Sequence, residues 1–343
     1  MKEIRIGFSN FWDNFDERNN LFYQLLSKHY IVTLSEQPDY LFCSVFGNKH
    51  LDYNCIKIFY TGENQAPDFN IIDYAIGFDH ITFGDRFFRF PYYYFYESDF
   101  RKMLHKHEIT ADILNQKKDF CSFVYSNNHA SPDRKQFYDL LSCYKTVNSG
   151  GRYLNNVGGP VKDKLAFQQK HKFCIAFENT SHEGYTTEKI VQAFAAQAIP
   201  IYWGDDTIAD TFNEQAFINC HSYSSFGEVV SVIKRIDNDD SLYLDMLRKP
   251  ALLRSTDEYD TKVKQLEEYL CHIIEQPLHE AERFSRHYWA TRYLSLIRQK
   301  ETLYRHSPRG IAEYVYKHTL WKVRHRSKLF WAIDRIVKSR NRY

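Results

Sequence analysis

The chain has 343 residues, a length that favours two domains over one. Hydrophobic residues make up 43% and charged residues 26%, which is typical of a soluble globular protein. The formal net charge of +2 excludes a global electrostatic attraction to nucleic acid.

The first part of the chain, residues 1–116, has the pattern of a mostly parallel α/β domain. "EIRIGF" alternates as a strand does, and residues 15–28 have helical spacing. Four more short apolar runs follow, "YIVTL", "DYLFCSVFG", "CIKIFYTGEN" and "DYAIGF", bounded by Pro, Asn, Asp and Gly. A polar helix is predicted over residues 101–116, with "NQKKD" as a linker.

The pattern then starts again, which predicts a second domain over residues 117–300. "DFCSFVYSN", "HKFCIAFEN", "IPIYW" and "AFINC" have the character of strands. Two consecutive α/β units predict two Rossmann-like domains that face each other across a cleft, and the last helix is a candidate to pack back on the first domain. Helices are predicted over residues 132–142, 187–197, 226–236 and 278–300.

No disulfide framework, leader or metal site is predicted. The seven cysteines are scattered without a C-x-x-C pair, as reduced thiols of a cytosolic protein are. "MKEIRIGFSNFWDNF" lacks the apolar segment of a signal peptide, and no apolar run approaches the roughly 20 residues of a membrane span. "DNDD" at residues 237–240 and the pair Asp205 and Asp206 suggest metal ligands, but capping and solvated loop roles are favoured. We expect chemistry that requires no cofactor, with stimulation by Mn²⁺ or Mg²⁺ left open.

One predicted helix has an unusual beginning. In "FENTSHEGYTTEKIVQAFAAQAIPIYWG", Thr186 is the expected N-cap, Glu188 and Lys189 lie in the first turn, and nearly every later position is apolar. A lysine there opposes the helix macrodipole. The buried helix opens at the carboxyl edge of a parallel sheet, where free N–H groups and Lys189 would suit a phosphate. The helix alone equally allows a dipole role for Glu188 and a solvated Lys189.

Three other polar segments follow predicted strands or lie in loops near the same edge. Ser126 and Asn127 open the stretch "SNNHASPDRKQF", where a simple turn is the favoured reading. Arg152 lies in the glycine-rich loop "NSGGRYLNN" and would suit a diphosphate. Glu63 in "TGEN" has the position of a cleft carboxylate, although position alone also allows a helix cap or a loop charge.

These segments carry a resemblance to a known family. The 28-residue block "FENTSHEGYTTEKIVQAFAAQAIPIYWG", with "YTGEN" and "DYAIGFDHITFGDRFFRFP" upstream, resembles the α-1,3/4-fucosyltransferases of glycosyltransferase family 10, the bacterial members especially. The likeness covers about residues 57–221. Family members often have "GYVTEK", and Thr186 replaces that valine here.

The resemblance implies the GT-B arrangement, GDP-fucose as donor and inversion at the fucose anomeric carbon. It implies that Glu63 is the catalytic base, a role that a carboxylate beside an acceptor hydroxyl can fill. It implies no metal ligand. The donor-binding residues that it implies are Ser126, Asn127, Arg152, Glu178, Asn179, Tyr185, Glu188 and Lys189, and the acceptor-binding residues are Asn64, Phe90 and Tyr92.

The expected function is therefore that of a bacterial inverting α-1,3-fucosyltransferase. It would move L-fucose to the GlcNAc of a Galβ1-4GlcNAc (LacNAc) acceptor and make a Lewis x-type product on surface glycan. Two alternatives stay open: another inverting GT-B nucleotide-sugar glycosyltransferase, and a non-catalytic module that binds a glycan or a GDP-sugar. Preference between type 1 and type 2 acceptors, the native glycan and the oligomeric state are left open.

The last segment, residues 301–343, is a separate basic tail. Nine lysines and arginines between residues 316 and 343 face the single acid Asp334 and interleave with Trp321, Phe330 and Trp331. Such a pattern predicts an amphipathic helix at an anionic membrane surface. Docking on the protein body and RNA binding are the weaker alternatives. We expect a cytoplasmic protein, peripheral on the inner face of the membrane, with no nucleic-acid partner.

Overall fold

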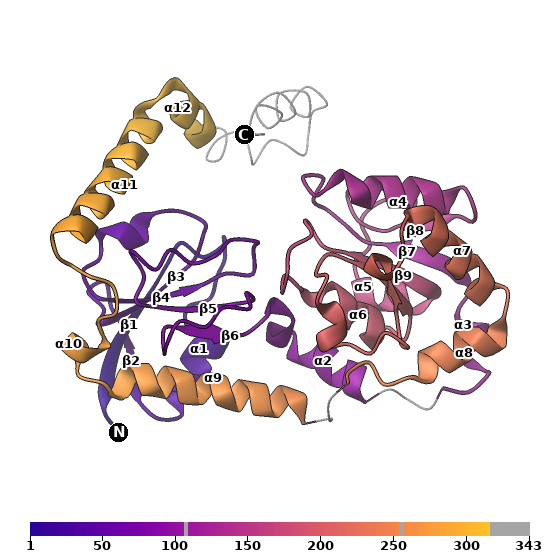
Figure 1. The fold of residues 1–343 in the computed structure, drawn as a ribbon, viewed down its shortest axis with the longest axis horizontal. Coiled ribbons are helices and arrows are strands. Elements are labelled where there is room, and N and C mark those ends of the chain that lie inside the picture. The colour runs from indigo at the N-terminus through magenta and orange to yellow at the C-terminus, as the bar shows by residue number, and fades with distance from the viewer. Residues whose placement is uncertain (106–108, 254–256, 316–343) are drawn as a thin grey trace. The chain divides into compact units, whose positions relative to one another are not determined.

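The computed structural model describes residues 1–105, 109–253 and 257–315. The chain forms two compact units, Met1–Arg283 and Phe284–Tyr343 (Figure 1). The first unit contains two parallel β-sheets, and the described helices of the second unit are α11 (Tyr288–His306) and α12 (Pro308–Val315). The predicted membrane-binding segment, residues 316–343, lies outside the described residues.

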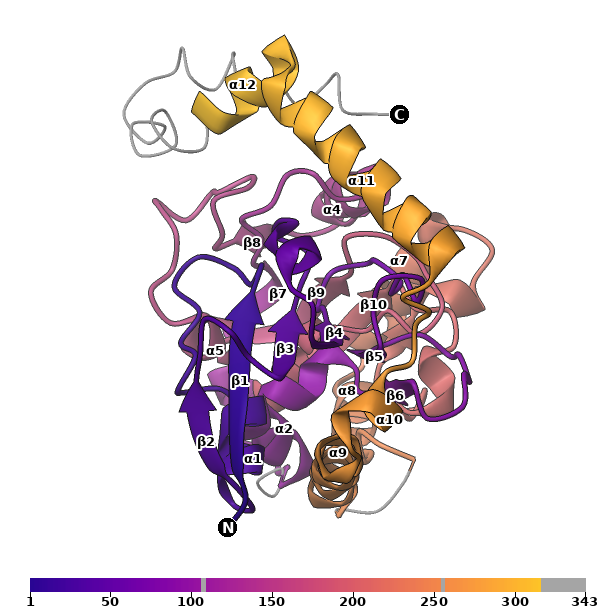
Figure 2. The ribbon, with the colours of Figure 1, turned by 90° about the vertical axis from the view of Figure 1, so that its left-hand side faces the viewer.

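The first sheet has six parallel strands in the order β2-β1-β3-β4-β5-β6 (Figure 2). Every residue of β3, β4 and β5 is buried, which explains why these strands appear in the sequence as continuous apolar runs. The strand bounds are β1 (Glu3–Ser9), β2 (Ile31–Leu34), β3 (Tyr40–Cys43), β4 (Ile56–Tyr60), β5 (Tyr74–Gly77) and β6 (Phe87–Arg89).

The second sheet has five parallel strands in the order β11-β10-β9-β7-β8. In each sheet the third strand along the chain pairs with the first strand, on the side away from the second strand. The topological switch points therefore lie between β1 and β3 and between β7 and β9, where open α/β sheets bind their ligands. The strand bounds are β7 (Asp119–Phe123), β8 (Val147–Ser149), β9 (His171–Phe177), β10 (Ile199–Trp203) and β11 (Ile218–Asn219).

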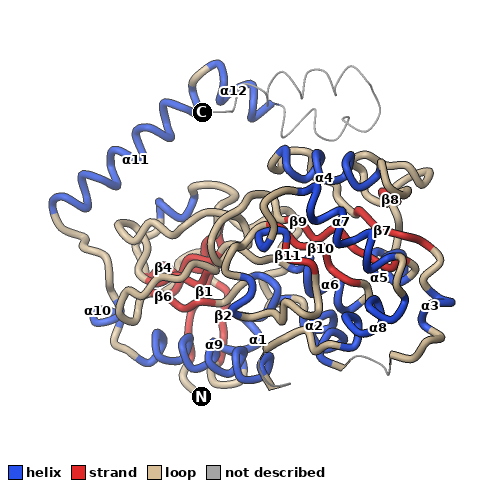
Figure 3. The backbone as a smooth tube through the Cα atoms, turned by 45° about the vertical axis from the view of Figure 1, so that its right-hand side comes forward, coloured by secondary structure: helices blue, strands red, loops and turns tan. Residues whose placement is uncertain are grey.

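Helices surround the strands of both sheets (Figure 3). We call the part of the first unit built around the first sheet the first half, and the part built around the second sheet the second half. Helix α6 of the second half packs against α2 of the first half, and Gln192 donates a hydrogen bond to Asp99 across this contact, at 3.0 Å. The helices of the first unit are α1 (Leu21–Ser27), α2 (Glu97–Leu104), α3 (Ile113–Gln116), α4 (Pro132–Ser142), α5 (Lys164–Gln169), α6 (Glu188–Ala195), α7 (Phe226–Asp237), α8 (Asp240–Arg248), α9 (Glu258–Glu275) and α10 (Leu278–Ala281), with short 3-10 helices η1 (Lys49–Asp52), η2 (Tyr92–Phe95), η3 (Ile208–Asp210) and η4 (Cys220–Ser222).

After the second sheet, α9 returns to the first half. Its Glu267 pairs with Lys28 at 2.6 Å, and its Glu258 accepts a hydrogen bond from Tyr94 at 3.0 Å. The backbone oxygen of Ile274 accepts a hydrogen bond from Lys2 at 2.8 Å. The first half is therefore built from two stretches that are far apart in the sequence.

Three predicted helices have different bounds in the structure. The helix expected over residues 15–28 begins at Leu21, because the side chain of Asn20 caps it by accepting the Tyr23 N–H. The helix expected over residues 101–116 is two short helices, α2 and α3, and the helix expected over residues 278–300 is interrupted between α10 and α11. None of the helices in the described ranges combines the length and the apolar character that crossing a bilayer demands.

Candidate active site

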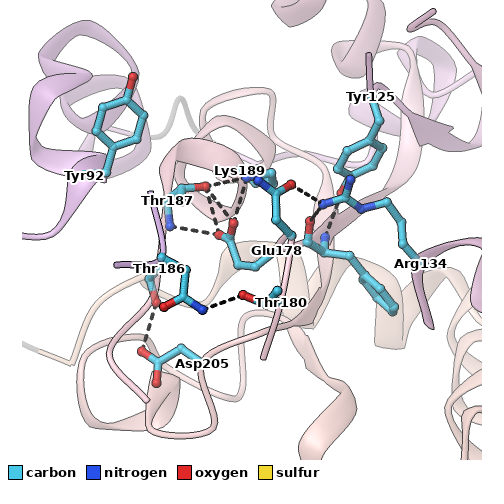
Figure 4. Close-up of polar contacts among 12 residues, drawn as sticks. Tyr92, Tyr125, Arg134, Glu178, Thr180, Thr186, Thr187, Lys189 and Asp205 are labelled. Atoms are coloured by element: carbon cyan, nitrogen blue, oxygen red, sulfur yellow. Dashed lines mark hydrogen bonds and ion pairs between the residues drawn. The ribbon is translucent and has the colours of Figure 1, made fainter. Parts of the chain in front are cut away.

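A buried arginine joins the two loops at the switch point of the second sheet. Arg134, in the first turn of α4, is 1% exposed and donates hydrogen bonds to the backbone oxygen of Phe177 at 3.0 Å and to Oδ1 of Asn179 at 2.9 Å. Its guanidinium lies 4.1 Å above the ring centre of Tyr125 (Figure 4). Two of its nitrogens, Nε and one Nη, have no hydrogen-bond partner. This arrangement holds the amide of Asn179 and the end of β9 beside the segment that follows β7.

Arg134 is not among the predicted site residues, although a signal was available. Arg134 lies three and seven residues before Phe137 and Leu141, which are the buried residues of α4. It therefore occupies the apolar face of the helix, where an arginine needs polar partners.

A second buried charge lies at the start of α6. Glu178 is 0% exposed, and its carboxylate accepts hydrogen bonds from the backbone N–H of Thr187 at 2.8 Å, from the Thr187 hydroxyl at 2.8 Å and from Lys189 at 2.7 Å (Figure 4). A carboxylate at this position satisfies the helix N-terminus. The expectation of free N–H groups at this helix end is therefore wrong for the N–H of the cap residue Thr187.

Lys189 is a half-buried, paired cation rather than a solvated one. Its side chain is 14% exposed, and its ammonium bonds the Glu178 carboxylate and the Thr187 hydroxyl, the latter at 2.6 Å. An ammonium has three donors, so one is left for a further partner. Burial lowers the pKa of Lys189, but the charges of Glu178 and Glu188 outweigh it and raise that pKa above its ordinary value. The side chain is thus a fixed cation at neutral pH.

Glu188 and a lysine from another helix complete this charge cluster. Burial would raise the pKa of Glu188, but the charges of Lys189 and Lys164 outweigh it and hold that pKa below its ordinary value. Lys164 opens α5 and donates to Oε1 of Gln192 at 2.5 Å, and burial lowers its pKa. Lys164 is not among the predicted site residues either, because nothing in the local pattern distinguishes it from an exposed lysine.

The turn before α6 is anchored by Asp205. The cap of α6 is Thr187, so the assignment of Thr186 as the N-cap was wrong. Thr186 instead donates to Oδ2 of the buried Asp205 at 2.9 Å, and the Gly184 N–H donates to Oδ1 at 2.8 Å. Asp205 is therefore a structural anchor, which corrects the expectation of a cap or a solvated loop charge.

This turn also touches the first half of the unit. Gly184 has φ +77°, and a Cβ atom there would lie 2.6 Å from the backbone oxygen of Phe78, so no other residue fits. The next residue, Tyr185, is buried with its ring centre 5.0 Å from that of Phe78. The predicted donor residue Tyr185 thus lies where the two halves meet.

The loop that carries Glu63 faces the same place. The Glu63 N–H donates to the Thr61 hydroxyl at 2.9 Å, the Glu63 side chain is exposed, and the amide of Asn64 donates to the hydroxyl of Thr180 at 2.6 Å. Thr180 follows β9, so this bond joins the Glu63 loop to the Glu178 segment. Burial raises the pKa of Tyr92, and the charges of Glu188 and Glu63 add to that rise. The Tyr92 ring packs against Gly62, where a Cβ atom would lie 2.7 Å from it.

The other predicted site residues have mixed positions. Phe90 is 1% exposed in the core of the first half, so the structure does not bring its side chain to the site. Ser126 is exposed, and Asn127 forms a turn by accepting the His129 N–H at 2.8 Å. Arg152 is exposed, in a loop held against Tyr125 by Gly151, whose Cβ position is 1.9 Å from the Tyr125 backbone oxygen.

The described part of the chain contains no group of three or more His, Cys, Asp or Glu side chains placed to hold a metal ion. The "DNDD" stretch has structural roles instead. Asp239 caps α8 by accepting the N–H groups of Ser241 and Leu242. Asp237 is buried and paired with Lys145 and Lys172, so the prediction of a cap or a solvated loop is right for Asp239 and wrong for Asp237.

Comparisons with known proteins agree with this arrangement. The profile of the Alpha-(1,3)-fucosyltransferase FucT N-terminal domain matches residues 6–96, and that of the Glycosyltransferase family 10 (fucosyltransferase) C-terminal domain matches residues 114–306. The chain is 37% identical to the Alpha-(1,3)-fucosyltransferase FucT of Helicobacter pylori over 284 residues, 71% of this chain and 59% of that protein. It thus spans about three fifths of that relative's length.

Two further likenesses are more distant or structural. The 4-galactosyl-N-acetylglucosaminide 3-alpha-L-fucosyltransferase 9 of Bos taurus is 29% identical over 137 residues, 39% of this chain and 37% of that protein. A crystal structure of an alpha1,3-fucosyltransferase with GDP-fucose is 31% identical and superposes with a TM-score of 0.66 over 78% of this chain and 90% of that one. Two parallel-sheet α/β domains in the GT-B arrangement, as predicted, are thereby confirmed. The chain belongs to glycosyltransferase family 10.

Proposed function

We propose that this protein is an α-1,3-fucosyltransferase that moves L-fucose from GDP-fucose to a hydroxyl of a saccharide. The observation that carries the proposal is the hydrogen bond between Asn64 and Thr180, because it joins the loop that carries the exposed Glu63 to the segment after β9, where Glu178 pairs with Lys189. The Helicobacter pylori relative, named an alpha-(1,3)-fucosyltransferase, and the related crystal structure with GDP-fucose support the same activity.

The second half, which carries the proposed donor site, supplies positive charge for a leaving diphosphate. Lys189 has one donor left, Arg134 has two unpaired nitrogens, and Lys164 lies within electrostatic range of Glu188. Arg152 is exposed on its loop beside Tyr125 and can turn toward the same anion. Cations fixed where negative charge develops stabilise the transition state without reorganising when the bond breaks. Glu178 holds Lys189 in place, which makes it a positioning residue.

The first half supplies the base. In the proposed reaction the carboxylate of Glu63 takes the proton of the acceptor hydroxyl while that oxygen forms a bond to the fucose anomeric carbon. The bond from that carbon to the GDP oxygen breaks on the opposite side, so the configuration inverts in one displacement. Tyr92, whose ring packs against Gly62 beside Glu63, is proposed to contact the saccharide as it reacts.

The acceptor that we propose is a Galβ1-4GlcNAc-type saccharide of a bacterial surface glycan, and the product is of the Lewis x type. The name of the Bos taurus relative supports this choice. We further propose that the reaction requires no metal, because protein cations neutralise the diphosphate. Residues 316–343 would hold the protein on the inner face of the cytoplasmic membrane, which their basic and aromatic composition supports.

A donor panel tests the proposal. Purified protein is incubated with GDP-fucose, GDP-mannose or UDP-galactose, with and without LacNAc, and hydrolysis and transfer are followed by chromatography. We expect turnover with GDP-fucose alone, a fucosylated trisaccharide, and substantial activity in excess EDTA. Turnover with another donor would favour a different transferase, and GDP binding without turnover would favour a binding module. Loss of all activity in EDTA, restored by one ion, would contradict the metal-free mechanism.

A further inference from the structure

A second opening lies at the switch point of the first sheet. It is a cavity of about 450 Å³ whose wall includes Phe11 and Trp12 from the loop after β1, Asn20 at the cap of α1, Tyr60 at the end of β4, and Tyr92 in η2. Its position at the carboxyl ends of β1 and β4 is one where α/β sheets bind ligands. Nothing in the proposed donor site uses it.

The cavity adjoins the proposed reaction centre. Tyr92, the first residue of η2, forms part of the cavity wall. A Cβ atom on Gly62, the residue before Glu63, would lie 2.7 Å from the Tyr92 ring. One wall of the cavity is therefore packed against the loop that carries the proposed base.

The lining has the chemistry of a sugar site. Trp12 is 41% exposed at the cavity and offers an aromatic face of the kind that packs against the C–H face of a pyranose ring. Asn14 supplies an amide that can bond hydroxyl groups, whereas the Asn20 amide caps α1 and donates to the backbone oxygens of Asp16 and Glu17. The Tyr60 hydroxyl, buried in the wall, has no hydrogen-bond partner. Mixed aromatic and amide walls suit a polyol better than a purely apolar ligand.

The charge of the lining is negative. No lysine or arginine lines the cavity, whereas the carboxylates of Asp16 and Glu97 do. Arg101 pairs with Glu97 at 2.8 Å from outside the lining and neutralises it, so the negative charge of the wall rests on Asp16, whose neighbour Arg18 is not in the lining. Such a wall disfavours phosphates and carboxylates, so an anionic ligand is the wrong occupant.

The loop after β1 is held in place without a ligand. Asn10, at φ +62°, accepts the His50 N–H at 2.9 Å, and the rings of Phe11 and Phe15 stack with their centres 4.1 Å apart. A wall that is already ordered loses little entropy when it binds.

We propose that this cavity binds the part of the acceptor saccharide that lies beyond the reacting sugar, and that it selects uncharged saccharides over those that carry an acid. The inference rests on the proposed function. It names residues that determine which saccharide is fucosylated, with Trp12 as the stacking face and Asp16 as the element that rejects anions.

The first test measures saccharide binding without turnover. LacNAc is titrated into the full-length protein, with and without GDP, and its binding is followed by saturation-transfer NMR. The KM for LacNAc is measured separately in assays of fucose transfer from GDP-fucose. We expect Trp12→Ala to raise the LacNAc dissociation constant and KM at least tenfold, with GDP affinity within twofold of wild type as the check on folding. Trp289→Ala is the control, because Trp289 is exposed on α11 and does not line the cavity.

The second test measures charge selection. Transfer to LacNAc is compared with transfer to the same saccharide capped with sialic acid, in wild type and in Asp16→Asn. We expect wild type to prefer the neutral saccharide at least tenfold, and Asp16→Asn to narrow that preference about fivefold at low salt.

The outcomes separate the inference from the proposed function. Unchanged LacNAc binding in Trp12→Ala, an equal loss in Trp289→Ala, or a preference for the sialylated saccharide would overturn the cavity assignment while GDP-fucose turnover persists. Absence of GDP-fucose turnover in wild type would contradict the proposed function, and the NMR titration would still decide whether the cavity binds a neutral saccharide.

Discussion

At the scale of single residues, the lysine in the first turn of α6 is explained by its partner. Lys189 opposes the helix macrodipole, but the buried carboxylate of Glu178 lies at the same helix end and pairs with it at 2.7 Å. The two charges therefore depend on each other for burial. The proposed diphosphate would meet a cation that is already fixed in direction.

This pairing predicts two separable effects of removing the lysine. Lys189→Ala should weaken GDP binding at least tenfold, because a charge-assisted hydrogen bond is lost. It should also lower the free energy of unfolding by about 3 kcal/mol, because Glu178 becomes a buried unpaired charge. Calorimetric GDP titration and urea unfolding measure the two effects.

A double variant serves as the control for this prediction. Glu178→Gln combined with Lys189→Ala removes both charges, so we expect much of the lost stability to return while GDP binding stays weak. Equal GDP affinity in wild type and Lys189→Ala would show that the lysine is only structural.

The exposed carboxylate of Glu63 gives a second prediction. Glu63→Gln should keep GDP affinity but lower kcat at least 100-fold, because the acceptor hydroxyl loses its base. Steady-state kinetics with GDP-fucose and LacNAc measure this, and Glu183→Gln, an exposed glutamate in the loop before α6, is the matched control. Turnover near that of wild type in Glu63→Gln would remove Glu63 from the proposed mechanism.

At the scale of elements, the interior strands and helices follow from local pattern. The apolar run of β10 (Ile199–Trp203) and the capped, proline-started α4 (Pro132–Ser142) have the bounds that the sequence predicts. The strands β6 and β8 were missed because each is a three-residue edge strand that includes polar residues and forms no continuous apolar run. Helix α9 was missed although its buried residues Leu266, Leu270, Ile273 and Ile274 have helical spacing; its return to the first sheet was not visible in that local pattern.

The site, like the secondary structure, could be predicted only as far as local sequence and the family resemblance reach. The resemblance pointed to Glu63, Glu178 and Lys189, which lie on loops and a helix end at the sheet edges. It could not predict that Lys189 is paired, or that Arg134 is buried, because both facts depend on partners brought together by folding. Asn179, which holds Arg134, is 45 residues further along the chain.

A structural aspartate at the end of α7 gives an element-scale prediction. Asp237 pairs with Lys145 from the segment after α4 and with Lys172 of β9, the latter at 3.2 Å. Burial would raise the pKa of Asp237, but the hydrogen bonds from these lysines and from Tyr144 outweigh it and keep that pKa below its ordinary value of 3.8. The carboxylate thus joins α7, α4 and the second sheet as an anion.

Asp237→Asn should therefore lower the free energy of unfolding by about 3 kcal/mol at pH 7. Because the folded-state pKa is depressed, this contribution is complete above the ordinary pKa of 3.8 and is lost as the pH falls through the folded value. Urea unfolding measures the difference in the free energy of unfolding between wild type and Asp237→Asn, and this difference should be smaller at pH 3 than at pH 7. Asp240→Asn is the control, since its side chain is 66% exposed and lies 3.6 Å from Lys172. A difference that stays constant with pH would contradict the ion-pair explanation.

At the scale of the whole molecule, the basic tail gives a prediction that leaves the first unit intact. Removal of residues 316–343 should abolish binding to anionic vesicles while transfer to soluble LacNAc persists, because every proposed site residue precedes residue 190. Binding of the full-length protein should fall with salt and leave an apolar remainder from Trp321, Phe330 and Trp331. Co-sedimentation with vesicles measures it. Equal sedimentation of both forms would rule out membrane binding through the tail, and unfolding of the truncated form would indicate a structural role.

The shared strand order of the two sheets has a consequence for how this protein can diversify. Each sheet offers its own switch point, one beside Arg134 and Glu178 and the other beside Trp12 and Tyr60. If the switch point beside Arg134 holds the nucleotide sugar and the one beside Trp12 holds the glycan, mutations can alter one recognition surface while the residues of the other stay unchanged. A lineage could then change the glycan that it decorates by substitutions in the loop after β1 and at the start of α1, and keep its sugar donor throughout.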